Sequence, residues 1–556
     1  MEKVDPFQLE IIRNVLVAAA EEMSVAIWRT SRSTVVRELL DFSTAIFDPS
    51  GDNVAQATRI PIHLNSMATC LADILADDIP ISQWCDGDVI ITNDPYRGGQ
   101  HLPDILTFRP VFLDGEMIAI TGALCHHIDV GGGAAGSFYA KAEEIYHEGL
   151  RIPPVKIVQE GVRNDALFDV ILQNSREPEK IGGDLSSQLA SLEVGAAGVL
   201  RMARRYGVGP LRDAMARILD QSEQALRAAL RAMPDGVYDF EDFVDNDGID
   251  DTPVRIHAVL TIDGDHAAVD FSASSPQARG PVNCTLNMTK SAVYFAIMAA
   301  AGADIAANSG CYRPISITAP KGLIVNCRHP APVANRMATG HRIANTMMGA
   351  LSKAVPERMP AAYYGVSYVY SLGVTKDDGS QDVYFDLEVG GWGGHPERDG
   401  ANGFSAGFHN ISNSPMEMIE SLYPVMFVAY GYTPDSGGAG RFRGGLGIHR
   451  EWRLDAEEGV LSANLDRFKF PPYGLSGGKK GSASRLLVRQ NGETIEADAK
   501  LAGKRLHKGD QVRLETSGGG GWGDASKRSD SAIKADIEEG FVTPEGAARD
   551  YGWKNG

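Results

Sequence analysis

The chain has 556 residues, 43% hydrophobic and 22% charged, a balance typical of a globular protein large enough for several domains. Its formal net charge of -19 argues against nucleic acid or an anionic membrane as a partner, and leaves small molecules and other proteins. Six scattered cysteines without a CxxC pair, no secretory-signal pattern and no apolar stretch of roughly 20 residues together predict a soluble, reduced, cytoplasmic protein.

The first predicted element is a helix that starts with Asp5 as N-cap and Pro6 at the first helical position. Its apolar residues recur at spacings of three and four: Leu9, Ile12, Leu16, Ala19, Met23 and Ile27. Strand-like sequence follows, with turns at Asp48-Pro49-Ser50-Gly51 and at Asp114-Gly115. The second turn predicts a hairpin whose later strand ends at Cys125, His126 and His127.

Residues 185–232 show a helical pattern that Gly207 to Pro210 divides in two. A β-rich half follows, with hairpin turns at Asp263-Gly264 and Asn491-Gly492, and Thr543-Pro544 starts one of the short helices expected at the end. The expected fold class is α+β, a large mixed multi-domain fold with several β-sheets and a central helical segment. The predicted regions are a metal-site α/β region (1–184), a helical segment (185–235), a central α+β region (236–430) and a β-rich region with terminal helices (431–556).

Two segments carry residues suited to metal binding: NDPYRGGQHLPD (93–104) and CHHIDVGGG (125–133). They place two clusters of His and Asp at the ends of neighbouring strands, and Pro103 favours a fixed shape between His101 and Asp104. Zinc accepts imidazole nitrogen together with carboxylate oxygen, as do manganese and iron. Asp41, at the start of an alternating strand, is a third candidate.

The spacing alone leaves other interpretations open. A His or Asp near a turn is more often a surface residue or a satisfied hydrogen-bond partner than a ligand. His127 and Asp129 could equally be groups that hold the tautomer of a ligating histidine.

Two glycine-rich strings, 437–447 and 517–524, resemble phosphate-binding loops. Neither ends in the Lys-Ser or Lys-Thr of a P-loop, and residues 517–524 do not follow a strand of a recognisable βαβ unit. Tight turns and close backbone packing are the preferred interpretation.

Along nearly the whole chain, the sequence resembles the hydantoinase B family, and its motifs stand in the same order as in that family. The family includes subunits of N-methylhydantoinases, caprolactamase, 5-oxoprolinase and the acetone and acetophenone carboxylases. The segments that carry the resemblance are DFSTAIFDPSG, GDVIITNDPYRGGQHLPD, HHIDVGG, EIYHEGLRIPPVKI, DFSASSPQARGPVN, GGAGRFRGGLG, PPYGLSGGKKG and TSGGGGWGD. Many amide-hydrolysing relatives have a different sequence where this chain reads STVVRELLDFS (33–43), which puts the substrate in doubt more than the metal.

The resemblance implies a divalent metal, zinc as first choice and manganese as second, held by Asp41, His101, Asp104 and His126. It places His127 and Asp129 around these ligands, where we assign them as catalytic, and His63 and Asn93 in the surroundings.

The implied function is that of the metal-bearing subunit of a two-component hydrolase acting on a hydantoin, lactam or oxoproline-like cyclic amide. A hydantoinase A-type partner would use ATP to phosphorylate the substrate, and metal-activated water would attack it here, within a hetero-oligomer. Two alternatives remain: a subunit of an ATP-dependent ketone carboxylase, which would need a third small subunit, and a structural partner with an inert metal site.

Overall fold

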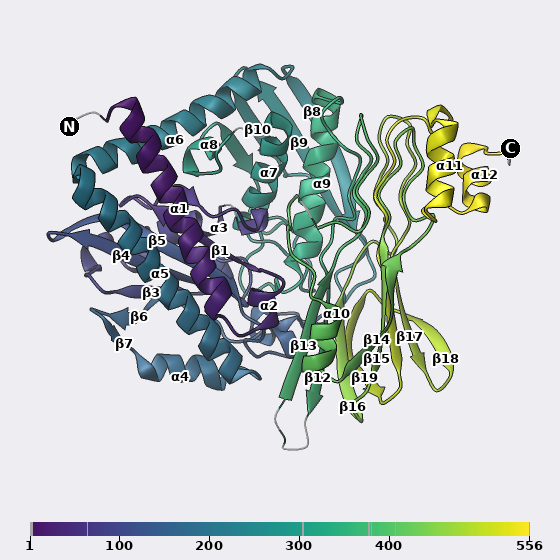
Figure 1. Cartoon of the computed structure of the whole chain (residues 1–556), viewed down its shortest axis with the longest axis horizontal. Coiled ribbons are helices and arrows are strands. Elements are labelled where there is room, and N and C mark those ends of the chain that lie inside the picture. The colour runs from purple at the N-terminus through teal and green to yellow at the C-terminus, as the bar shows by residue number, and fades with distance from the viewer. Residues whose placement is uncertain are drawn as a thin grey trace.

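The structure of the chain is a computed structural model, which describes residues 4–63, 65–302, 305–375, 379, 381–405 and 407–554. Its strands form four β-sheets, and long helices pack between and against them (Figure 1). The expected α+β class with several sheets is confirmed. Among the described residues, no helix combines the length and apolar character needed to cross a membrane.

The N-terminal sheet has seven antiparallel strands in the order β2-β1-β5-β4-β3-β6-β7. Both turns predicted in this region are confirmed, and Asp114 (φ 52°) and Gly115 (φ 82°) have the left-handed geometry that joins two tightly paired strands. The strands are β1 (Phe42–Phe47), β2 (Asn53–Gln56), β3 (Val89–Thr92), β4 (Asp104–Leu113), β5 (Glu116–His126), β6 (Val155–Gln159) and β7 (Val162–Arg163).

Three long helices accompany this sheet: α1 (Pro6–Thr30), α5 (Pro178–Tyr206) and α6 (Val208–Arg231) (Figure 1). The Asp5 carboxylate accepts hydrogen bonds from two amides of the first turn of α1, and the predicted apolar face of α1 is buried against α5 and β1. The predicted break between the later helices is confirmed, because Gly207 (φ 92°) separates α5 from α6.

The central region holds a second sheet in the order β11-β10-β9-β8, against which α9 (Arg336–Ala354) packs, and α7 (Leu286–Ala301) packs against α9. Nearly every side chain of α9 is buried, so this helix lies in the interior rather than on the surface (Figure 1). The strands are β8 (Gly236–Val244), β9 (Val254–Asp263), β10 (His266–Asp270) and β11 (Ile315–Thr318), and the predicted turn at Asp263-Gly264 joins β9 to β10.

Two further sheets follow, in the orders β13-β12-β16-β19 and β14-β15-β20-β17-β18. The Asn491-Gly492 turn joins β17 to β18, as predicted. The strands are β12 (Tyr368–Thr375), β13 (Gln381–Glu388), β14 (Val425–Tyr432), β15 (Ile448–Leu454), β16 (Glu458–Asn464), β17 (Arg485–Gln490), β18 (Glu493–Ala497), β19 (Lys500–His507) and β20 (Gln511–Glu515).

Short helices complete the fold, and the Thr543 side chain caps the last of them as predicted. Two predicted region boundaries fall inside elements, at residue 184 in α5 and at residue 430 in β14, so the four-region division stays a prediction. The short helices are α2 (Thr34–Arg37), α3 (Ser66–Asp73), α4 (Asp165–Gln173), α8 (Ser309–Tyr312), α10 (Met416–Leu422), α11 (Asp530–Glu538) and α12 (Pro544–Tyr551), with single turns η1 (Pro61–His63), η2 (Ile74–Asp78), η3 (Ile81–Gln83), η4 (Pro95–Arg97), η5 (Ala135–Ser137), η6 (Ile145–His147) and η7 (Ala525–Lys527).

Four glycine-containing segments, 390–394, 437–447, 474–481 and 517–523, lie against one another and form what we call the glycine layer. They exchange backbone hydrogen bonds, among them Gly391 N to Ser517 O and Gly438 N to Gly519 O. A Cβ atom on Gly519 would lie 2.0 Å from the carbonyl oxygen of Trp392. Backbone packing therefore accounts for both glycine strings, which confirms the interpretation preferred from the sequence.

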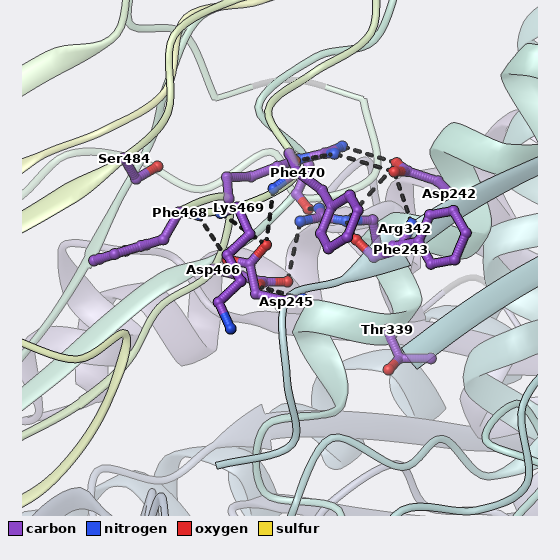
Figure 2. Close-up of polar contacts among 12 residues, drawn as sticks. Asp242, Phe243, Asp245, Thr339, Arg342, Asp466, Phe468, Lys469, Phe470 and Ser484 are labelled. Carbon is purple, nitrogen blue, oxygen red and sulfur yellow. Dashed lines mark hydrogen bonds and ion pairs between the residues drawn. The ribbon is translucent and has the colours of Figure 1, made fainter. Parts of the chain in front are cut away.

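A buried group of charges joins the central region to the C-terminal sheets (Figure 2). Arg342 of α9 pairs with Asp466 at 3.0 Å, and Arg467 pairs with Asp242 of β8 at 3.1 Å. Arg342 also donates to the backbone oxygen of Gly365. Because a buried charge is costly without its partner, these pairs fix α9 and β8 relative to the segment that follows β16.

Candidate metal centre

Three neighbouring strands bring the predicted ligands together. Asp104 is the first residue of β4 and pairs in register with His126, the last residue of β5. Asp41 directly precedes β1, and its carbonyl oxygen accepts a hydrogen bond from His126 N. The turn before β4 closes with a hydrogen bond from Asp104 N to the His101 carbonyl oxygen, which brings both side chains to the same end of the sheet.

The ligand atoms of three residues form a compact triangle. His101 Nε2 lies 2.9 Å from Asp104 Oδ1 and 3.1 Å from His126 Nδ1, and the latter two atoms are 3.1 Å apart. All three side chains are buried. In a tetrahedral zinc site with bonds of about 2.0–2.1 Å, ligand atoms lie about 3.3 Å apart. The donor set and the spacing therefore fit one divalent metal.

Asp41 lies at the edge of this triangle. Its Oδ2 is 3.8 Å from His126 Nδ1, and its Oδ1 is 3.8 Å from His63 Nε2. The other ring nitrogen of His63 is hydrogen-bonded to Ser43 Oγ at 2.9 Å. The structure thus places the fourth predicted ligand next to the other three, but at a greater distance than they have from one another.

Arg336, the first residue of α9, contacts the triangle through Asp104. Its Nη2 donates to Asp104 Oδ2 at 2.8 Å, and both side chains are buried. Asp104 therefore offers one oxygen to the triangle and the other to a guanidinium. Arg336 was not found from the sequence, because 232 positions separate it from Asp104 and no local pattern marks it.

The electrostatics favour the ligand forms of His101 and Asp104, whereas burial disfavours the ionised form of Asp41. Burial, followed by the charge of Arg336, holds the pKa of His101 well below its usual value, so His101 is neutral. Burial opposes ionisation of Asp104, but the neighbouring His101 and Arg336 hold its pKa well below the ordinary value. Burial raises the pKa of Asp41, against the opposing effect of His126. A neutral imidazole and a carboxylate are the states that bind a metal.

The triangle faces a small chamber of about 20 Å³, room for a water molecule and little more. Its far side comes from distant segments, and the Phe385 ring stacks on that of His126 with centroids 5.6 Å apart. The chamber is lined by Asp41, Ile62, His63, His101, His126, Phe138, Arg336, Met337, Ser367, Val369, Phe385, Leu387 and His409. A larger cavity of about 320 Å³ adjoins it at His63 and is walled mainly by residues 54–61 and 306–308.

The other residues named from the sequence have different surroundings. His127 Nε2 lies 3.3 Å from Gln188 Oε1 of α5. Asp129 accepts hydrogen bonds from the backbone of Gly131 and Gly136 and pairs with Arg176 at 2.9 Å. The hydrogen bonds of both side chains thus go to the supporting helix and loop rather than to the triangle.

Asn93 connects the loop before the ligands to the segment that leads into β6. Its amide donates to the carbonyl oxygens of Leu102 and Leu150, and its Oδ1 accepts from Ile152 N. Ser367, Phe385 and His409 line the chamber but were not found from the sequence, since each stands alone in an ordinary segment.

The chain is similar to proteins of one family. A family profile described as hydantoinase B/oxoprolinase matches residues 5–525. The B-type subunit of a putative D-/L-hydantoinase from Pseudomonas sp. (strain NS671) is 30% identical over 99% of this chain and 95% of its own length. The beta chain of caprolactamase from Pseudomonas jessenii is 32% identical over 99% of this chain and 96% of its own length.

Solved structures agree with this result. The crystal structure of ATP-dependent caprolactamase from Pseudomonas jessenii superposes with a TM-score of 0.91 at 30% identity, covering 99% of this chain and 96% of that one. Nucleotide-free acetone carboxylase superposes with the same score at 18% identity over 99% of this chain and 79% of that one, which shows a shared fold. The extent of the profile match, with full-length relatives at 30% identity or more, shows that this chain belongs to the hydantoinase B/oxoprolinase family.

Proposed function

We propose that this chain is the metal-bearing subunit of an ATP-dependent enzyme that opens cyclic amides such as lactams and hydantoins, and that an ATP-binding partner activates the substrate. The observation that carries the proposal is the buried triangle of His101 Nε2, Asp104 Oδ1 and His126 Nδ1. The full-length relatives, named as components of a hydantoinase and of a caprolactamase, support the substrate class and the need for a partner.

The metal would be held by His101, Asp104 and His126, with Asp41 as fourth ligand after a small shift. Zinc is the first choice and manganese the second, because two imidazoles with two carboxylates suit both. When bound, such a metal acts as a Lewis acid that lowers the pKa of a water ligand toward 7.

The chain's own residues prepare this site. Arg336 keeps Asp104 ionised, and the packing of Phe138 and Phe385 limits the space available to bulk water. The cavity beside His63, of about 320 Å³, is large enough for a small cyclic amide, which makes it the candidate site for the body of the substrate.

ATP binding is assigned to a hydantoinase A-type partner. The glycine strings of this chain pack against backbone so closely that a Cβ atom on Gly519 or Gly520 would approach a carbonyl oxygen to 2.0 or 1.9 Å. A phosphate-binding loop must instead leave its amides open to the ligand. The isolated chain should therefore not bind ATP at submicromolar concentration, which calorimetry would check.

Co-expression with the partner, followed by a screen of lactams, hydantoins and ketones with ATP, tests the function. A ketone carboxylase subunit is the alternative, supported by the shared fold of acetone carboxylase. Carboxylation of a ketone without ring opening of any cyclic amide would favour that alternative, as would a neighbouring gene that encodes a third, small component.

The role of the metal is tested by His101→Ala and Asp41→Ala in the assembled complex. If activation takes place in the partner and attack takes place here, ring opening should fall far more than substrate-dependent ATP turnover, because the partner is unchanged. Elemental analysis should find about one divalent ion per wild-type chain. Unaffected ring opening in both variants would eliminate the metal mechanism.

A further inference from the structure

The side of the chamber opposite the ligands carries a second polar group. Ser367, just before β12, and His409 both line the chamber. Behind them lie His341 of α9 and Tyr363, and all four side chains are buried. None of the four has a role in the proposed metal site, so their placement beside it calls for another explanation.

The four side chains form a continuous chain of hydrogen bonds. Tyr363 Oη lies 2.8 Å from His341 Nδ1, and His341 Nε2 lies 3.2 Å from Ser367 Oγ. Ser367 Oγ is then 3.3 Å from one ring nitrogen of His409 and 3.4 Å from the other. The serine hydroxyl therefore lies between His341 on one side and His409 at the chamber on the other.

The donor and acceptor in each of these hydrogen bonds follow from the cost of an unpaired hydroxyl. Among the described residues, His341 Nδ1 is the one hydrogen-bond partner of the Tyr363 hydroxyl. If His341 donated from Nδ1, the buried phenolic hydrogen would have no acceptor, at a cost of about 1–3 kcal/mol. Tyr363 therefore donates to Nδ1, His341 donates from Nε2 to Ser367 Oγ, and the Ser367 hydrogen must point to His409 or into the chamber.

We propose that Ser367 is a fixed hydrogen-bond donor to the oxygen of the substrate's reacting carbonyl group, and that His341 and Tyr363 are positioning residues that aim it. The inference rests on the proposed function, since it takes the substrate to be a cyclic amide or its activated form. Ser367 exchanges its long contact with His409 for the substrate oxygen. A donor set in place before charge develops stabilises the transition state more than the ground state.

The hydrogen-bonded side chains act by donating a hydrogen bond and not by releasing a proton. Burial holds the pKa of His341 well below its ordinary value, and burial raises the pKa of Tyr363 well above its own. Neither group ionises near neutral pH, so the hydrogen-bond direction persists through the catalytic cycle.

Kinetics of the complex with its ATP-binding partner, using the best cyclic amide from the substrate screen, give the first test. Ser367→Ala should lower kcat by about 100- to 1000-fold while the metal content stays at the wild-type level. Tyr363→Phe should lower kcat about tenfold or more, and adding it to Ser367→Ala should cause no further loss, because both changes remove the same aimed hydroxyl.

Two buried neighbours supply matched controls. Ser371→Ala removes a hydroxyl of β12 that has no hydrogen-bond partner among the described residues. Tyr364→Phe removes a buried phenolic hydroxyl that is not part of the Tyr363–His341–Ser367 series of hydrogen bonds. Both variants should retain wild-type kcat within about threefold. A loss of less than about threefold in Ser367→Ala, or additive losses in the double variant, would overturn the inference.

Neutron diffraction from crystals of the full chain tests the hydrogen-bond direction without any activity. Deuterium is expected on His341 Nε2 and on Tyr363 Oη, with Nδ1 bare. Deuterium on Nδ1 would overturn this inference alone. A wild-type complex that opens no cyclic amide would instead overturn the proposed function, so the two failures are distinguishable.

Discussion

The two sides of the metal chamber are built in different ways. On the ligand side, His101, Asp104 and His126 come from one β-hairpin and the turn before it, and strand register alone brings Asp104 opposite His126. On the far side, Ser367 directly precedes β12 and Phe385 lies in β13, which pairs with β12, whereas His409 comes from a segment outside both strands. The glycine layer anchors this side, since Tyr364 N donates to Gly391 O and Gly520 N donates to Ala362 O.

This difference indicates which residues should affect metal binding and which should affect turnover. Ligand geometry depends on local hairpin structure and on one long-range partner, Arg336. The geometry of the far side depends on how the β12–β13 pair, the segment around His409 and the glycine layer pack together. Changes to the ligand side should therefore abolish metal binding, whereas changes to the far side should leave the metal and alter turnover or substrate choice.

The largest effect is expected from Asp104→Ala. The change removes a ligand and leaves Arg336 buried without its partner, which should weaken zinc binding at least about 100-fold and lower the free energy of unfolding by about 3–5 kcal/mol. Elemental analysis and chemical denaturation of the chain would measure both. Asp165→Ala breaks an exposed pair with Arg163 and should cost less than about 1 kcal/mol. Wild-type zinc affinity in Asp104→Ala would refute the ligand assignment.

Gly519→Ala should disrupt the packing of the far side and leave the ligand side unchanged. The new Cβ would lie 2.0 Å from Trp392 O, which follows the strand carrying Phe385. We expect a loss of about 3 kcal/mol or more in the free energy of unfolding, measured by urea denaturation. Gly209→Ala in α6 meets nothing within 4 Å and should be neutral or stabilising by up to about 1 kcal/mol. Equal stability of the two variants would mean that the glycine layer does not hold this side.

Glu148 allows a test of the segment that leads into α9, which begins at Arg336. Its Oε1 accepts a hydrogen bond from Ala334 N, close to Arg336, and burial raises its pKa to about 8. In the folded protein the Glu148 carboxyl keeps its proton up to about pH 8, whereas in the unfolded chain it loses this proton above its ordinary pKa of about 4.5. The free energy of unfolding therefore falls as the pH rises from about 4.5 to 8. Glu148→Gln cannot ionise and should lose less stability across this range.

Thermal unfolding of both proteins at pH 5 and pH 8 would measure the difference, which we expect to be on the order of 2–4 kcal/mol. Parallel pH profiles for the wild type and Glu148→Gln would show that Glu148 is ionised in the folded protein. The sign of the difference is the sharper result, because an ordinary ion-paired carboxylate would make the protein more stable as the pH rises.

The smallest effect is expected from Phe385→Leu. The ring stacks on His126, so its loss should enlarge the chamber at a cost of about 1–2 kcal/mol while zinc content stays unchanged. Activity should shift toward bulkier lactams, measured as relative kcat/KM over a ring-size series. Phe108→Leu makes a similar cavity in the N-terminal sheet and should not change this preference. Loss of zinc in Phe385→Leu would show that the two sides are not independent.

The sequence by itself determined the local elements of this protein. The N-cap of α1, the turns at Asp114-Gly115 and Asn491-Gly492, and the ligand-bearing ends of β4 and β5 were all predicted, because turn chemistry and residue periodicity act over a few positions. The ordered motifs also identified the family, and with it the set Asp41, His101, Asp104 and His126, whose role as ligands stays a prediction.

Only the tertiary structure decided what surrounds those ligands. It placed Arg336 on Asp104, turned Asp129 toward its own loop and Arg176, and formed the far side from Ser367, Phe385 and His409. The contacts of Asp104 with Arg336 and of Asp129 with Arg176 have no sequence signal, because each joins residues far apart in the chain whose approach depends on how whole sheets and helices pack. Local sequence preferences determine where a strand ends, and long-range packing determines which side chains contact that end.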